Sequence, residues 1–147
     1  LLEHPEQWQA LKRGDTSIDT AVEELLRWTT PALHAGRTAT ADTEIGGRPV
    51  EAGQIVTVWN ASANRDEQVF DDPFRFDVGR DPNPHLGFGG GGPHFCIGRH
   101  LALLEVELML GTLVDQVAEF VPAGPSRRLR SYQFHGLTRL PVHLVAA

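Results

Sequence analysis

The only cysteine of the chain, Cys96, follows a run of four glycines (residues 89–92) after three intervening residues, and it directly precedes an apolar segment. The run reads FGGGGPHFCIG over residues 88–98, and the apolar segment predicts a helix over residues 98–119. A cysteine at the start of a helix meets unpaired backbone N–H groups and positive partial charge, and both stabilise a thiolate. The glycines leave space beside the sulfur for a large, flat group. Haem iron bound by one cysteine thiolate satisfies all of these conditions.

Three other interpretations compete with haem binding at this segment. A lone cysteine is most often a small buried hydrophobe, but a cysteine that is merely packed needs no glycines before it. Residues 87–92 match the dinucleotide pattern G-x-G-x-x-G, yet that pattern must follow a strand, and the preceding residues 81–86 read as a loop. Zinc is the third interpretation, because three histidines lie near the cysteine: His85, His94 and His100. Structural zinc sites use C-x-x-C pairs, which this chain lacks, so haem is the preferred interpretation.

Composition excludes several classes of partner. The formal net charge is −6 and no basic tract occurs, which argues against a nucleic-acid partner. The hydrophobic content of 41% is typical of a globular chain, and no apolar run reaches the length of a membrane span. One cysteine excludes an internal disulfide framework and fits a reducing compartment, so we expect a cytoplasmic protein.

Local signals predict short helices, small hairpins and one long loop. One helix is predicted over residues 5–11, ending near Gly14, and a second over residues 18–28, with Ser17 as its N-cap. Residues 60–68 are expected to form a helix or a helical turn. Strands are expected over residues 37–45 and 54–59, with Gly46 and Gly47 in a turn, and a last hairpin over residues 129–145 with Gly136 at its middle. Residues 71–95 contain four prolines and many glycines, which predicts an irregular loop of the length that usually carries function.

Five motif segments follow one another along the chain. Glu24 and Arg27 form an E-x-x-R pattern, residues 62–66 read SANRD, residues 73–76 read PFRF, residues 76–82 read FDVGRDP, and the Cys96 segment comes last. In this order and spacing the sequence resembles the C-terminal third of a bacterial, soluble-type member of the cytochrome P-450 superfamily, the haem-thiolate monooxygenases. One departure is an extra glycine, since Phe88 stands eight residues before the cysteine where the family places its aromatic residue seven before.

The resemblance implies the fold class and the organisation of the chain. The fold is α+β and mainly α: an E-x-x-R helix, small β-hairpins, a meander, the cysteine loop, a long buried helix and a terminal β-hairpin. Residues 1–147 are expected to form a single partial domain, the C-terminal haem-binding part, with the N-terminal two-thirds of the fold absent. The helix that carries the family's acid–alcohol pair is then missing, so the chain alone is expected to be inactive.

The resemblance also implies roles for individual residues. Cys96 is the expected catalytic residue and metal ligand, as the proximal thiolate. The residues expected to contact haem b (iron protoporphyrin IX) are Arg37, Phe88, His94, Phe95, Cys96, Ile97, Gly98 and Ala102. Among these, Arg37 and His94 are expected to pair with the haem propionates. Glu24 and Arg27 share one side of a helix and, by resemblance, form a buried structural network with Arg75.

The implied activity is insertion of one oxygen atom from O2 into a small apolar substrate. A ferredoxin and ferredoxin reductase-type donor would supply two electrons, docking near Arg65 or Arg99. Residues 32–35 and 132–134 are expected to contact the substrate, which is a sterol, a fatty acid or a polyketide-like molecule. The alternative is a non-catalytic, truncated remnant that binds haem weakly or not at all.

Overall fold

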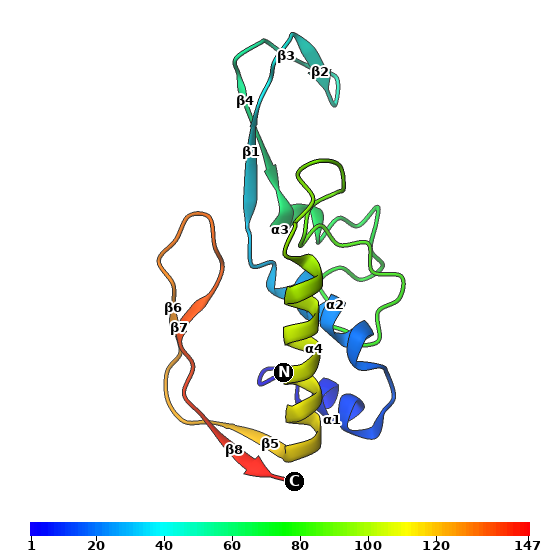
Figure 1. Ribbon diagram of the computed structural model, residues 1–147, viewed down its shortest axis with the longest axis vertical. Coiled ribbons are helices and arrows are strands. Elements are labelled where there is room, and N and C mark those ends of the chain that lie inside the picture. Colours follow the sequence, from blue (N-terminus) through cyan, green and yellow to red (C-terminus); the bar gives the residue numbers. More distant parts are fainter.

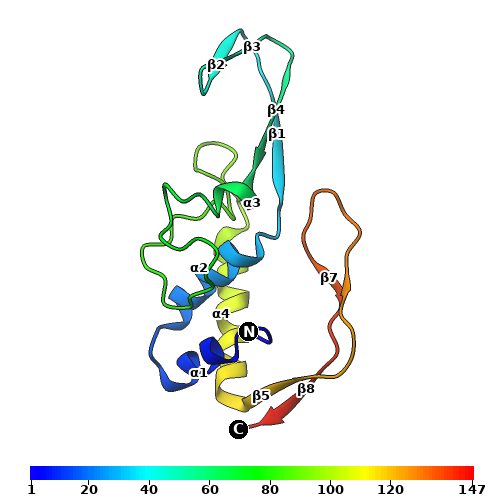
Figure 2. The ribbon, with the colours of Figure 1, turned by 180° about the vertical axis from the view of Figure 1, so that it is seen from behind.

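A computed structural model describes residues 1–147 and shows an elongated molecule arranged along one long helix, α4 (Figure 1). The helices are α1 (Pro5–Arg13), α2 (Ile18–Thr29), α3 (Asn60–Ala63) and α4 (Arg99–Gln116). The strands are β1 (His34–Thr38), β2 (Thr43–Ile45), β3 (Arg48–Val50), β4 (Ile55–Trp59), β5 (Val117–Pro122), β6 (Arg127–Arg128), β7 (Leu137–Arg139) and β8 (Val142–Ala146). Helices α1 and α2 lie along one side of α4, and the C-terminal strands form an arm on its other side (Figures 1 and 2).

The first two helices begin and end where local signals predict. Proline occupies the first turn of α1, and the helix stops at Gly14, whose positive φ of 72° lets its N–H bond back to the carbonyls of Ala10 and Leu11. In α2 the Ser17 side chain accepts a hydrogen bond from the Thr20 N–H. Both helices run one or two residues past the predicted ends, a difference within the fraying of helix termini.

A small hydrophobic core joins α1, α2 and the loop before α4. Its eight buried members are Trp8, Leu11, Ala21, Val22, Phe76, Val78, Leu110 and Val117. Two hydrogen bonds also join α1 to the C-terminal end of α4 and to β5. Lys12 Nζ donates to the Val114 carbonyl at 2.8 Å, and Trp8 Nε1 donates to the Ala118 carbonyl at 3.0 Å. This core therefore fixes α4, and with it the loop that precedes α4, against α1 and α2.

Helix α4 is expected to be the long buried helix of a larger fold, and within these 147 residues one side of it is exposed. Leu110 is its only fully buried residue. Leu101, Leu104, Leu108 and Met109 are each more than half exposed. The reason is that α1 and α2 cover only one side of the helix. No helix of the chain combines the length and the apolar content that crossing a bilayer requires.

All strands pair in four separate, two-stranded antiparallel sheets. The predicted strand over residues 37–45 is wrong, because that segment is divided between two of these sheets. Its first part belongs to β1, which pairs with β4, and its last part is β2, which pairs with β3. Gly46 and Gly47 form the turn of the β2–β3 hairpin with φ of 57° and 77°, as the sequence predicts.

The predicted helices over residues 98–119 and 60–68 both end earlier than expected. Helix α4 stops at Gln116 rather than at Glu119, because Val117 starts strand β5, which pairs with β8 at the end of the chain. The tail holds the short β6–β7 pair as well as β8. Only residues 60–63 of the expected helix over residues 60–68 are helical, and residues 71–95 form the predicted irregular loop.

Candidate functional site

Cys96 lies two residues before Gly98, the N-cap of α4, and its thiol is exposed. The loop that carries it closes on itself, because the Cys96 N–H donates to the Phe88 carbonyl at 3.0 Å. The Arg99 N–H in turn donates to the Cys96 carbonyl at 3.3 Å. The thiol therefore stands at a helix N-terminus, on a loop whose two ends are hydrogen-bonded to each other.

Three glycines of this loop adopt a backbone conformation that other residues disfavour. Gly89, Gly91 and Gly92 have φ of 94°, 94° and 75°. A Cβ atom on Gly91 or Gly92 would have no neighbour within 4 Å, so these glycines are required by the turn of the chain and leave open space around it. Gly98 is different, because a Cβ there would lie 3.9 Å from the Cys96 sulfur, an ordinary contact distance.

The surroundings of Cys96 fit a haem bound through a thiolate. The thiol is exposed, and a deprotonated cysteine sulfur is an anionic donor to iron. Beside it, Ile97 is fully exposed, and Phe95 and Leu101 are exposed at 43% and 61%, so apolar side chains are available to a flat macrocycle. Phe88, in the cysteine loop, and Ala102, in the first turn of α4, are half-buried. The donor and the apolar surface that such a group needs thus occur together.

Arg37 and His94, the expected propionate partners, are both exposed. Arg37 lies on β1, and its guanidinium donates to the adjacent Gly36 carbonyl at 2.7 Å. His94 lies in the glycine loop and makes no hydrogen bond. Both side chains are available to a ligand, and their pairing with a haem propionate stays a prediction.

The Glu24 and Arg27 side chains form a completely buried ion pair. Arg27 directs its other N–H groups to three carbonyls of the loop that follows α3: those of Asn64, Pro73 and Arg75, at 2.8, 2.8 and 3.1 Å. Arg75 therefore takes part through its backbone, and its side chain is 65% exposed beside Asp77 instead of joining the buried network.

Two polar side chains that the sequence did not single out complete this network. Asn83 Nδ2 donates to the Glu24 carboxylate at 3.0 Å, and the Arg80 Nε lies 3.3 Å from the same carboxylate. Arg80 also donates to the carbonyls of Asp71, Asp72 and Arg75. The network thus fastens the loop beneath Cys96 to α2, and its contacts are structural.

The two arginines expected near a redox partner are both engaged within the chain. The Arg65 guanidinium lies 4.7 Å from the centre of the Trp28 ring and donates to the Trp28 carbonyl at 2.8 Å. Burial lowers the pKa of Arg65, and the nearby charge of Arg27 lowers it further. Arg99 is paired with Glu23 at 2.8 Å. Of the two, Arg99 lies nearer Cys96 along the chain.

The two segments expected to contact substrate are side by side, although about one hundred residues separate them. The Leu33 N–H donates to the Gln133 carbonyl at 2.9 Å, and Ala32 and Phe134 form an isolated antiparallel bridge. The ring nitrogen Nε2 of His34 lies 3.1 Å from the Tyr132 carbonyl. A single surface therefore contains both segments.

The family model for cytochrome P450 matches residues 16–127 of this chain. The protein named cytochrome P450 NovI from Streptomyces niveus is 46% identical over 144 residues, which are 98% of this chain and 35% of that protein. A steroid C26-monooxygenase from Rhodococcus jostii is 42% identical over 142 residues, 97% of this chain and 30% of that protein. The chain thus spans about a third of the length of these relatives.

Solved structures agree with the sequence relatives. The crystal structure of P450 OxyD, involved in the biosynthesis of vancomycin-type antibiotics, superposes with a TM-score of 0.90 at 40% identity, covering 97% of this chain and 36% of that one. P450BioI, solved in complex with an acyl carrier protein that bears hexadec-9Z-enoic acid, gives a TM-score of 0.93 at 39% identity, with 99% and 38% coverage. The arrangement of helices and sheets described above is therefore that of the C-terminal portion of these folds.

Proposed function

This chain belongs to the cytochrome P450 family, and on that premise we propose that it forms the haem-binding part of a monooxygenase that uses haem b. One observation carries the proposal: the only cysteine is exposed before the N-terminus of α4, on a loop in which Gly91 and Gly92 have open space around them. When bound, the haem supplies the redox chemistry by which O2 and two electrons hydroxylate a C–H bond. The proposed activity is that of the whole protein. The relatives named above are about three times as long as this chain.

Each proposed role rests on a property of the residue. Cys96 is proposed as the thiolate ligand, because it is the only cysteine and its thiol is exposed two residues before the N-cap of α4. Arg37 and His94 are exposed cationic or hydrogen-bonding groups suited to the two haem carboxylates. Phe88, Phe95, Ile97, Gly98 and Ala102 lie on the cysteine loop or in the first turn of α4 and are the residues proposed to contact the macrocycle. A free thiol on an exposed loop also fits the reducing cytoplasm.

The substrate is proposed to be a small apolar molecule such as a sterol, a fatty acid or a polyketide-like compound. Support comes from relatives named as a steroid C26-monooxygenase and a methyl-branched lipid omega-hydroxylase. In this chain the surface formed by residues 32–35 and 132–134 is the proposed contact, and it exposes Tyr132 and Phe134. Electrons are proposed to come from a ferredoxin-type donor that docks beside Arg99.

The experiment is a haemin titration of the chain, of Cys96→Ser and of His94→Ala, each reduced under carbon monoxide and followed by absorbance. Thiolate ligation gives the long-wavelength Soret band in the parent chain and in His94→Ala, which keeps the thiol, but not in Cys96→Ser. Haem uptake that survives in Cys96→Ser would show that a histidine holds the iron and would overturn the proposal. Absence of uptake by the parent chain would favour the non-catalytic alternative.

A further inference from the structure

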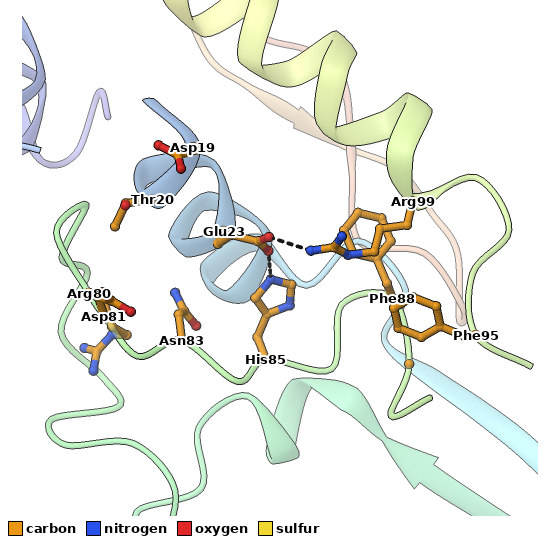
Figure 3. Close-up of a pocket in the computed structure, with 11 residues that line it drawn as sticks. Asp19, Thr20, Glu23, Arg80, Asp81, Asn83, His85, Phe88, Phe95 and Arg99 are labelled. Carbon is orange, nitrogen blue, oxygen red and sulfur yellow. Dashed lines mark hydrogen bonds and ion pairs between the residues drawn. The ribbon is translucent and has the colours of Figure 1, made fainter. Parts of the chain in front are cut away.

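Glu23 on α2 holds both flanks of the segment that carries Cys96. Its Oε2 lies 2.6 Å from His85 Nε2, and its Oε1 accepts a hydrogen bond from Arg99 Nη2 at 2.8 Å (Figure 3). His85 stands two residues before the glycine run that begins at Gly87, and Arg99 is the first residue of α4. One carboxylate thus joins the entrance and the exit of the cysteine loop to a third element.

The hydrogen bonds of His85 define its role in this arrangement. The Gly87 N–H donates to His85 Nδ1 at 2.9 Å, so Nδ1 is an acceptor and Nε2 carries the proton that is donated to Glu23. The His85 side chain is only 5% exposed, whereas the Glu23 side chain is 29% exposed. The loop entrance is therefore fixed by a buried ring with both nitrogens engaged.

The exit of the loop is fixed by contacts that converge on Phe88. The Arg99 guanidinium lies 5.7 Å from the centre of the Phe88 ring. The two side chains are neighbours in Figure 3. The Phe88 carbonyl accepts the hydrogen bond from the Cys96 N–H. The position of the Cys96 backbone thus depends on Phe88, which packs beneath the cation that Glu23 holds.

We propose that Glu23 is a positioning residue for the Cys96 thiolate, acting through His85 and Arg99 rather than by contact with a ligand. The function of that thiolate rests on the proposed function, whereas the fixing of the loop does not. Without the Glu23 carboxylate, Arg99 and His85 lose their shared partner, and the two flanks of the loop are joined only through their contacts with Phe88. Opening of the loop is then more frequent, and the Cys96 sulfur is held less firmly in the position from which it would bind the haem.

The first test measures amide hydrogen exchange of the 147-residue chain by mass spectrometry, in Glu23→Ala and in the control Glu67→Ala. Glu67 is an exposed carboxylate that makes no ion pair or hydrogen bond. We expect exchange of residues 85–98 to become roughly tenfold faster in Glu23→Ala only, in line with the loss of one or two partly exposed polar contacts. Exchange of α1 should not change. A loop rate equal to that of the parent chain, or equal acceleration of every segment, would overturn the proposal.

A second pair of variants leaves Glu23 in place. In Gly87→Ala the new Cβ would lie 2.9 Å from His85 Nδ1, so the ring must shift from the position in which its Nε2 contacts Glu23. In Gly90→Ala the nearest atom is Leu86 Cδ2 at 3.7 Å, an ordinary contact, and neither glycine has a positive φ. Faster loop exchange in Gly87→Ala but not in Gly90→Ala supports the proposal, and equal rates in the two variants contradict it.

Haem-loaded protein gives an independent readout. In Glu23→Ala a smaller fraction of the reduced carbon monoxide complex should show the long-wavelength Soret band, while Glu67→Ala should match the parent chain. An unchanged fraction would contradict a role for Glu23 in holding the thiolate. If the parent chain takes up no haem through Cys96, the proposed function fails, and the exchange rates of the loop still decide whether Glu23 positions it.

Discussion

Arg27 and Glu24 face each other across one turn of α2 and form two parallel hydrogen bonds, from Nε to Oε2 at 2.7 Å and from Nη2 to Oε1 at 2.8 Å. Neither side chain is exposed to solvent. Charges buried in this way are stable only when all of their donors and acceptors are satisfied, and here the remaining donors of Arg27 reach loop carbonyls. The pair therefore acts as an anchor for the loop that leads to Cys96.

Removing one member of this pair should be strongly destabilising. We expect Arg27→Ala to lower the free energy of unfolding by about 3–5 kcal/mol, because the Glu24 carboxylate would stay buried without its partner. The control is Arg13→Ala, which breaks an exposed pair with Asp15 and should cost less than about 1 kcal/mol. Urea unfolding of both variants measures the difference, and similar losses in the two would contradict the assigned role.

Asn64 offers a test of the same network that depends on pH. Its Nδ2 donates to Thr30 Oγ1 at 3.0 Å, while the Thr30 hydroxyl already donates to the Arg27 carbonyl. In Asn64→Asp an acceptor replaces that donor at a fully buried position, so we expect a loss of about 1–3 kcal/mol or more near neutral pH.

The sign of this pH dependence follows from burial. A buried carboxylic acid has a raised pKa in the folded state, so the penalty is absent below the unfolded pKa and grows as pH rises through the folded value. Urea unfolding at several pH values should therefore show a smaller loss for Asn64→Asp in acid. The matched variant Asn64→Ala lacks a titrating group and should lose the same amount at every pH; parallel curves for the two variants would refute this account.

Much of the fold could be predicted because its signals are local. Pro5 and Gly14 mark the ends of α1, Ser17 marks the start of α2, and Gly46 and Gly47 mark a hairpin turn. The interrupted strand and the early end of α4 could not be predicted in this way. Strand β5 forms because it pairs with β8, more than twenty residues further along the chain, and no local pattern at Val117 announces that partner.

The candidate site shows the same division. Cys96 and the E-x-x-R pair are visible as short motifs, since each lies within one segment. Glu23 gave no signal, because its partners His85 and Arg99 lie 62 and 76 residues away in sequence. The exposed side chain of Arg75 was also unpredictable, since Arg27 uses the carbonyl of that residue rather than its guanidinium.

The N-terminus of α2 links stability to pH in the acid range. The Ser17 side chain and the Thr20 N–H lower the pKa of Asp19 below its usual value of 3.8. The ionised group therefore adds stability above pH 3.8, and this contribution is lost as pH falls below 3.8 through the lowered pKa. The Tm of Asp19→Asn should lie below that of the parent chain above pH 3.8, and the two Tm values should converge as pH falls below 3.8.

Ser17→Ala tests the cause of that shift. We expect the free energy of unfolding to fall by about 1 kcal/mol through loss of the N-cap. A carboxyl NMR titration should also show the pKa of Asp19 moving up toward its usual value. Ser126→Ala, at an exposed position without a side-chain hydrogen bond, is the control and should change neither quantity. An unmoved Asp19 titration in Ser17→Ala would exclude the hydroxyl as the cause.

His135 attaches the C-terminal arm to the end of α2. Its Nδ1 lies 2.8 Å from the Thr29 carbonyl, its N–H donates to the Pro31 carbonyl at 2.8 Å, and its Nε2 contacts the Arg128 guanidinium. In His135→Ala the two ring contacts are lost, while the backbone contacts of residues 133–135 with residues 31–33 remain, so exchange of residues 127–139 should become several times faster, by about three- to tenfold. His143→Ala, on exposed strand β8, should leave that segment unchanged. Equal rates in both variants would show that the ring is not the attachment.

Every strand of this chain pairs with only one other strand, and this affects how the chain behaves in solution. Each strand keeps one edge along which no other strand pairs, and such edges accept the backbone of a neighbouring molecule. Strands β6 and β7 are only two and three residues long and carry arginines, features that discourage lateral growth. Strand β4 is longer and exposes Ile55, Val58 and Trp59. The β5–β8 pair is as long and exposes Leu144 and Val145, so self-association of this chain should begin at the edges of the β1–β4 and β5–β8 ribbons and intensify with concentration.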